Sequence, residues 1–375
     1  MLTIDAKKFL GLLKPVKDML PNGTTCAIKC ENNNIIFNVL ESSMFYAEVN
    51  MDILKGDLEG IYYVSTDQLI KVLKFFNTVN IKGDRGTLWF TSDRSKYSVG
   101  GVLPDSDGDY FAIEKNEVKK YTVLENKKFI PAMKHIFEDK EGGFGPDQYI
   151  WIKDGFIWSS YYSTDIESMV RIPTITNTGI SDEGFFSIHN LYGNFISKVK
   201  ENFKIFKTKK HINIYNSNYF LHFSALRQFS ETNYLVQAKN FADRHQHSEE
   251  IFSFDSKALK EGLSNLLFYF GVDLSEGGVA ITKEGDRLFL NNLSKDSNIS
   301  DVGKEEYVIN AISDKDFCIS VDSNILMRIM NCSDEEVVDW KLLISEEESP
   351  DGNKYCDNYV TIGDMIQGFG GEIIV

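Results

Sequence analysis

The sequence predicts an α+β fold made of three copies of one domain, each with two helices packed on curved antiparallel sheets. Two observations lead to this prediction. A unit of strand, serine and amphipathic helix occurs three times, with its serine at Ser65, Ser187 and Ser320, about a third of the 375 residues apart. In addition, each third of the chain holds two helical segments and about eight short runs rich in β-branched and aromatic residues.

The first third begins with a helix over 5–20, whose apolar stripe includes Phe9, Leu13 and Val16. Pro15 lies inside this helix and should kink or shorten it. A second helix begins at Ser65, whose hydroxyl is expected to accept from a free backbone N–H of the first turn. Strands are predicted at 26–30, 34–39, 44–51, 60–64, 79–83, 87–92 and 96–102.

The second and third parts repeat this order. Helices are predicted over 127–138 and 255–270, and after the caps Ser187 and Ser320. Strands are predicted at 149–154, 156–162, 168–173, 211–216, 219–225, 233–238, 278–283, 287–292, 305–312, 339–345 and 358–363. Polar connectors at 104–120 and 239–250 place the domains at 1–119, 120–247 and 248–375.

Several classes of protein are disfavoured. The longest apolar run, Leu266–Val272, is far short of the ~20 residues that a membrane span needs. The N-terminal ten residues are too charged for a signal peptide. A cytoplasmic protein with no membrane partner is therefore expected. Five cysteines form no CxxC pair, and His245 and His247 lie in a charged connector, so no metal and no cofactor are expected. No catalytic motif is present, and the glycine clusters 142–145 and 368–371 are interpreted as turns. The sequence therefore predicts a protein that is not an enzyme.

The distribution of charge points to a polyanion. The chain carries a net charge of −15, but its six predicted helices hold twice as many basic as acidic side chains. Lysines on exposed helix faces also serve solubility, and that alternative stays open. Because the domain repeats, equivalent helices would face one side, and a cationic surface binds DNA phosphates without reading sequence.

Four segments resemble a known family. They are LLKPV at 12–16, RSKYSVGGVLPDSDGDYF at 94–111, STD at 163–165 and NYVTI at 358–362. Together with the three repeats and the length, they resemble the bacterial DNA sliding clamp, the β subunit of DNA polymerase III. The Lys-, Asn- and Ile-rich composition and the divergence would suit a bacteriophage-encoded clamp.

The resemblance implies that the chain is half of a ring: a head-to-tail homodimer that encircles double-stranded DNA, is placed there by a clamp loader and tethers a DNA polymerase. The residues expected to face DNA are Lys14, Lys71, Lys74, Lys134, Lys198, Lys200 and Arg328. Those expected at the dimer interface are Arg94, Lys96, Tyr97 and Val99 on one side, and Leu267, Phe268, Tyr269, Glu305 and Glu306 on the other.

A cleft for a partner peptide is expected between the second and third domains, lined by Thr164, Ile166, Met169, Leu235, Val360, Ile362 and Met365. The alternative is that these are ordinary core residues of two sheets, in part so for Leu235 and Val360. The family's Gly-His-Arg run after Thr-Asp is absent, Phe229–Thr232 replaces its Phe-Pro-Asp-Tyr turn, and residues 363–375 are interpreted as an added tail. The competing hypothesis is a clamp-like protein that binds a replication partner without encircling DNA.

Overall fold

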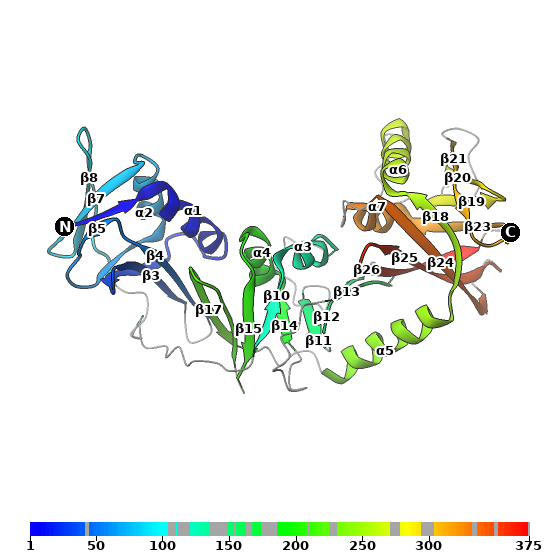
Figure 1. Ribbon diagram of the computed structural model, residues 1–375, viewed down its shortest axis with the longest axis horizontal. Coiled ribbons are helices and arrows are strands. Elements are labelled where there is room, and N and C mark those ends of the chain that lie inside the picture. The colour runs from blue at the N-terminus through cyan, green and yellow to red at the C-terminus, as the bar shows by residue number, and fades with distance from the viewer. Residues whose placement is uncertain are drawn as a thin grey trace. The chain divides into compact units, whose positions relative to one another are not determined.

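A computed structural model describes the chain at residues 1–41, 45–103, 110, 121–135, 149–153, 155–162, 167–173, 186–208, 211–224, 231–270, 278–293, 304–331, 336–348 and 352–373. Within these residues the fold is α+β, with antiparallel sheets and few helices (Figure 1). The predicted fold class is confirmed.

The threefold repeat is visible in the order of the elements: strand, helix, three strands, strand, helix, three strands. In repeat 1 these are β1 (Leu2–Asp5), α1 (Ala6–Lys17), β2 (Thr25–Glu31), β3 (Asn34–Glu41), β4 (Phe45–Asp52), β6 (Tyr62–Ser65), α2 (Thr66–Leu73), β7 (Thr78–Asp84), β8 (Thr87–Thr91) and β9 (Lys96–Val99). Repeat 2 comprises β10 (Thr122–Leu124), α3 (Asn126–His135), β11 (Tyr149–Lys153), β12 (Phe156–Tyr162), β13 (Glu167–Pro173), β14 (Phe186–His189), α4 (Asn190–Lys198), β15 (Phe203–Lys207), β16 (His211–Tyr215) and β17 (Tyr219–Ser224).

Repeat 3 comprises β18 (Glu249–Asp255), α6 (Ser256–Phe270), β19 (Gly278–Glu284), β20 (Arg287–Asn292), β21 (Glu305–Val308), β23 (Phe317–Asp322), α7 (Ser323–Asn331), β24 (Val337–Glu348), β25 (Lys354–Ile362) and β26 (Met365–Ile373). Two-residue strands, β5 (Lys55–Gly56) and β22 (Asn310–Ala311), are added in repeats 1 and 3. A further helix, α5 (Glu231–His247), joins repeats 2 and 3.

Several sequence predictions are wrong in detail. The strand predicted at 233–238 and the connector after it form α5, because Ala238, Phe241 and His245 recur at helical spacing and outweigh the β-propensity of Tyr234 and Val236. The tail and the glycine turn at 368–371 belong to β26, the last strand of repeat 3. Strands β1, β10, β15 and β18 were not predicted.

The predicted serine caps are also corrected. Ser65 is the N-cap of α2, but its side chain makes no capping hydrogen bond. Ser187 and Ser320 lie in strands β14 and β23, before their helices begin. At α7 the capping carboxylate is that of Asp322, which accepts from the Ile325 N–H at 3.1 Å. The first helix ends at Lys17, two residues after Pro15, as the predicted shortening requires.

The first compact unit combines repeat 1 with α4 and β15–β17 of repeat 2. Its larger sheet has the order β10-β15-β16-β17-β4-β3-β2-β6, so the β17–β4 pair joins the two repeats. Its smaller sheet has the order β5-β1-β7-β8-β9. Helix α1 packs against α2, β4 and β7, with Phe9, Leu13 and Val16 in the core.

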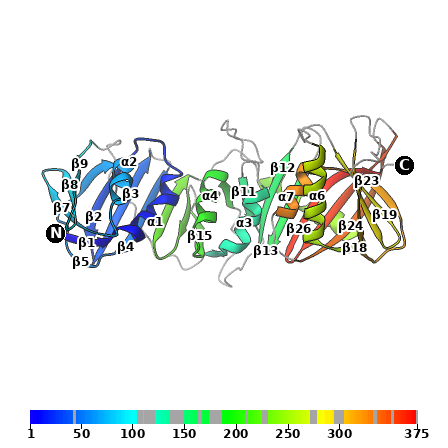
Figure 2. The same cartoon turned by 90° about the horizontal axis from the view of Figure 1, so that it is seen from above.

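The second unit combines α3 and β11–β13 of repeat 2 with α5 and repeat 3. Strand β26 is central, since it pairs with β13, β23 and β25. Helices α6 and α7 lie side by side (Figure 2) on one side of this sheet, and α5 lies on the other (Figure 1). Repeat 2 is therefore divided between the two units. The domain boundaries near 120 and 248 stay predictions about the sequence repeats.

Candidate nucleic-acid interface and partner surfaces

Three of the basic residues predicted to face DNA are exposed in the first unit, on α1, on α2 and at the end of α2. Lys14 lies on α1, Lys71 lies on α2, and Lys74 is the C-cap of α2. None of the three forms a salt bridge with a described carboxylate. Because α1 and α2 pack against each other, these ammonium groups belong to one helix layer.

Two other basic residues of this layer have acidic partners. The Nζ of Lys17 lies 3.0 Å from Oδ1 of Asp67, in the first turn of α2. The Nζ of Lys198, at the end of α4, donates to Oδ2 of Asp18 at 2.8 Å and ties α4 to the end of α1. Lys200 follows α4 and is exposed. Asp18 therefore neutralises part of the charge that Lys198 would offer to DNA.

The second unit carries the remaining DNA-facing candidates. Lys134 lies on α3 and Arg328 on α7, and the side chains of both fall outside the described part of the chain. Lys127, also on α3, is exposed and belongs to the same basic set, although the sequence analysis did not select it. The same is true of Lys7 and Lys8 on α1. The excess of basic residues in these helices was the signal that could have found them.

Strand β9 is a free edge of the smaller sheet, because β8 is its only partner strand among the described residues. Arg94, Lys96 and Tyr97 are exposed there, whereas Val99 is 1% exposed and packs within its own unit. The Tyr97 ring stacks on Phe75, with centroids 4.8 Å apart, and Phe75 is itself 63% exposed. Phe75 was not predicted, although it follows α2 next to Phe76, which alone fits the apolar stripe.

In the second unit β21 is the corresponding edge, because β20 is its one partner strand within the part of the chain that the structure describes. Glu305 and Glu306 lie on it, and Glu306 pairs with Arg287 at 2.7 Å. Burial and the neighbouring Glu305 raise the pKa of Tyr307 to about 12. Val308 is 78% exposed at the end of this strand. Leu267, Phe268 and Tyr269 lie in the last turn of α6, with side chains outside the described part.

The two edges have complementary properties. The β9 edge carries exposed Arg94 and Lys96, and the β21 edge carries Glu305 and Glu306. Among the described residues each edge strand pairs with one neighbouring strand, and each carries an exposed side chain with apolar surface, Tyr97 on β9 and Val308 on β21. An edge strand of this kind can take up a strand of another chain.

Several solved structures share the fold of this chain over almost their whole length. The DNA polymerase III subunit beta from Pseudomonas aeruginosa has a TM-score of 0.70 at 11% identity, with 100% of this chain and 99% of that chain covered. The beta subunit from Streptococcus pyogenes gives 0.70 at 14% identity, and the one from Thermotoga maritima gives 0.69 at 10%, each with the same coverage. This chain has the fold of the DNA polymerase III beta subunit.

The resemblance found in the sequence is therefore confirmed at the level of the fold. No protein-family model matches the chain, and no curated protein matches it. Because the identities are this low, the likeness to the solved structures lies in the order of the repeated elements and in the apolar pattern of the sequence.

The residues predicted to line the peptide cleft fall into two groups, those outside the described part of the chain and those in the core. Thr164 and Ile166 lie outside the described residues, and so do the side chains of Met169 and Leu235, which are placed in β13 and α5. Val360, Ile362 and Met365 are at most 4% exposed and belong to the core of the second unit.

The strand register gives the backbone positions of part of this set. Met169 pairs with Gly368, which pairs with Tyr359. Val360 and Ile362 alternate with Tyr359 along β25 and so share one face of the sheet. The cleft itself stays a prediction.

Chemistry at a metal ion has no support from the described side chains, which contain no group of three or more His, Cys, Asp or Glu placed to hold one. Among the described helices, none is long and apolar enough to cross a membrane.

Proposed function

We propose that this protein is a DNA sliding clamp, a non-catalytic processivity factor that acts in the cytoplasm. Two copies would close head to tail around duplex DNA, a clamp loader would place the ring, and a DNA polymerase would be held on it. The observation that carries this proposal is the match of the complete clamp fold, over 100% of this chain and 99% of the P. aeruginosa subunit.

The charge distribution supports the DNA contact. Exposed lysines lie on α1, α2 and α3, while the whole chain carries a net charge of −15. DNA is negatively charged too, so the net charge of this chain alone would repel it. The basic helices are therefore the part of the surface that would attract the phosphates.

The two free edges support closure of the ring. Strand β9 of one copy would pair with β21 of the other, with Tyr97 and Phe75 packing against the last turn of α6. Arg94 and Lys96 would lie near Glu305 and Glu306. Exposed ion pairs contribute at most about 1 kcal/mol, so the aromatic contacts would supply most of the affinity.

Sedimentation equilibrium combined with negative-stain imaging tests the proposal. A clamp should sediment at twice the chain mass of 42.8 kDa and appear as closed rings. Monomers at micromolar concentration, with no rings in the images, would favour instead a clamp-like protein that binds its partner without encircling DNA.

A further inference from the structure

The chain contains one Asn-Gly pair, Asn22 and Gly23, in the turn between α1 and β2. Both residues are exposed, and the φ of Gly23 is +86°, which a glycine adopts without strain. The turn therefore accounts for the glycine. An asparagine that precedes a glycine is also the asparagine most prone to deamidation, because no side chain hinders the nitrogen of the glycine.

Deamidation is a reaction between the two residues of this pair. The Gly23 nitrogen attacks Cγ of Asn22, and a succinimide ring forms. The side-chain nitrogen of Asn22 leaves as ammonia, which carries away the proton that the Gly23 N–H gives up. Water then opens one of the two ring C–N bonds and leaves aspartate or isoaspartate at position 22. One water is consumed and one ammonia released, so the reaction needs no oxidant or reductant.

Asp67, in the first turn of α2, holds the attacking nitrogen. Its Oδ2 accepts from the Gly23 N–H at 2.7 Å, and this bond is the largest cause of the lowered pKa of the Asp67 carboxyl. The nitrogen attacks only after it gives up its proton, and a carboxylate that accepts the N–H stabilises the form that keeps the proton. A carboxylate of lowered pKa is also too weak a base to remove that proton. Asp67 is therefore a positioning residue that restrains the pair.

Lys17, the last residue of α1, contacts the group under attack. Its Nζ donates to Oδ1 of Asn22 at 3.3 Å and lies 3.0 Å from Oδ1 of Asp67. When the nitrogen adds to Cγ, negative charge develops on Oδ1 of Asn22, and an ammonium group within hydrogen-bond distance stabilises that charge. Lys17 thus favours the attack that Asp67 restrains.

We propose that Asn22 and Gly23 form a deamidation site that Lys17 activates and that Asp67 keeps closed. Conversion would place a carboxylate beside Lys17, where it competes with Asp67 for the same ammonium group. The isoaspartate product also adds a methylene to the main chain and so shifts the Gly23 N–H relative to Asp67. The site does not depend on the proposed function, and its tests use neither DNA nor the dimer.

Incubation of the whole chain at neutral pH, followed by peptide mapping with mass spectrometry, measures the rate of conversion at position 22. The wild-type chain should convert at least ten times more slowly than a synthetic peptide of residues 18–25. Asp67→Ala should raise the rate of the chain at least tenfold. Asp67→Asn keeps an oxygen that accepts more weakly than a carboxylate, so its rate should fall between the two. This second variant carries the same test if Asp67→Ala does not fold.

Three further variants separate the causes. Adding Lys17→Met to Asp67→Ala should slow conversion at least threefold. Val79→Ala removes buried methyl groups from β7 of the same unit, so it lowers stability without changing the turn and should leave the rate unchanged. Asn22→Gln should abolish the mass change at this position, because the longer side chain must close a six-membered ring.

Circular dichroism would show that each variant keeps its fold. A wild-type chain that converts as fast as the peptide, or an Asp67→Ala chain that converts no faster than the wild type, would overturn the restraint by Asp67. Equal rates with and without Lys17 would overturn its part in the attack. If Val79→Ala speeds conversion as much as Asp67→Ala does, loosening of the fold sets the rate and the proposal fails.

Discussion

At the scale of single residues, the apolar stripe predicted for α2 is confirmed, whereas its polar cap is not. Leu69, Leu73 and Phe76 are buried as their spacing requires. At the start of the same helix, however, the expected Ser65 hydroxyl bond is absent. Asp67 instead accepts from the Gly23 N–H at 2.7 Å and pairs with Lys17. Burial follows from periodicity, but a polar partner 44 residues away depends on the folded chain.

Asp67→Asn should destabilise the protein in a pH-dependent way. The Gly23 N–H and then Lys17 hold the pKa of the Asp67 carboxyl below its ordinary value, so the charged form stabilises the folded state. That contribution is present above the unfolded-state pKa of about 4 and is lost as pH falls through the folded-state pKa.

Because Asp67 is partly exposed, we expect a loss of about 1 kcal/mol at pH 7, which shrinks towards zero as pH falls through the folded-state pKa. Urea unfolding at several pH values measures it. A difference that is constant with pH would show that the effect of the substitution is not electrostatic.

At the scale of elements, the sequence predicted the repeat but missed α5 and β26. The pattern of 233–238, with Tyr234 and Val236 near alternate positions, indicated a strand, and the glycines at 368–371 indicated a turn. Both interpretations used local propensity. The Phe241 ring occupies the space above Gly368, so position 368 has room for a glycine and no larger residue. The helical spacing of Ala238, Phe241 and His245 is present in the sequence, whereas the pairing of β26 with β13 and β25, which makes 368 a strand position, depends on the folded chain.

For helix α2, reversing the charge of Lys71 and Lys74 should weaken DNA binding. If each lysine contacts one phosphate, losing both should lower the slope of log K against log salt by about 2. Fluorescence anisotropy with a short duplex at several salt concentrations measures it.

The control for α2 is Lys55→Glu with Lys82→Glu, which reverses two exposed lysines on strands β5 and β7 of the same unit. Equal loss in both pairs would show that overall charge, and not the helix layer, governs the DNA contact.

At the scale of the whole molecule, the helices differ in their balance of charge. Helices α1, α3 and α4 carry more basic than acidic residues, whereas α2 carries one of each and α5 two of each. In the second unit α5 also lies on the opposite side of the sheet from α6 and α7. The helix that was not predicted, α5, thus has no basic excess, and the DNA-binding hypothesis does not depend on it.

Tyr97→Glu tests ring closure at this scale. Tyr97 is 37% exposed on the free edge β9 and stacks on the more exposed Phe75. A carboxylate at this position would remove the stacked surface and face Glu305 and Glu306, so two causes act in the same direction. The expected result is a monomer on a sizing column at concentrations where the wild-type chain is a dimer.

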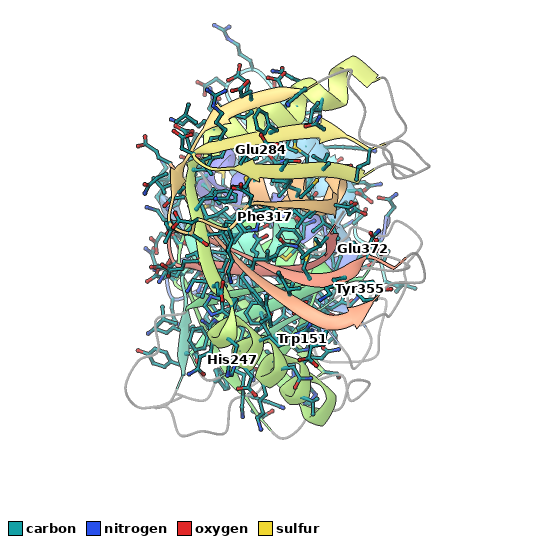
Figure 3. All side chains as sticks on the ribbon, turned by 90° about the vertical axis from the view of Figure 1, so that its right-hand side faces the viewer. Trp151, His247, Glu284, Phe317, Tyr355 and Glu372 are labelled. Atoms are coloured by element: carbon teal, nitrogen blue, oxygen red, sulfur yellow. The ribbon has the colours of Figure 1, made fainter. Side chains whose placement is uncertain are left out.

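Tyr355→Glu is the matched control, because Tyr355 is 40% exposed on β25, which is neither of the two edge strands. Figure 3 shows its place beside Glu372, its neighbour in the strand register. This variant should stay dimeric. A new charge at a buried contact could not be accommodated without loss of affinity. If Tyr97→Glu also stays dimeric while the wild type forms rings, the ring must therefore close through a surface other than β9.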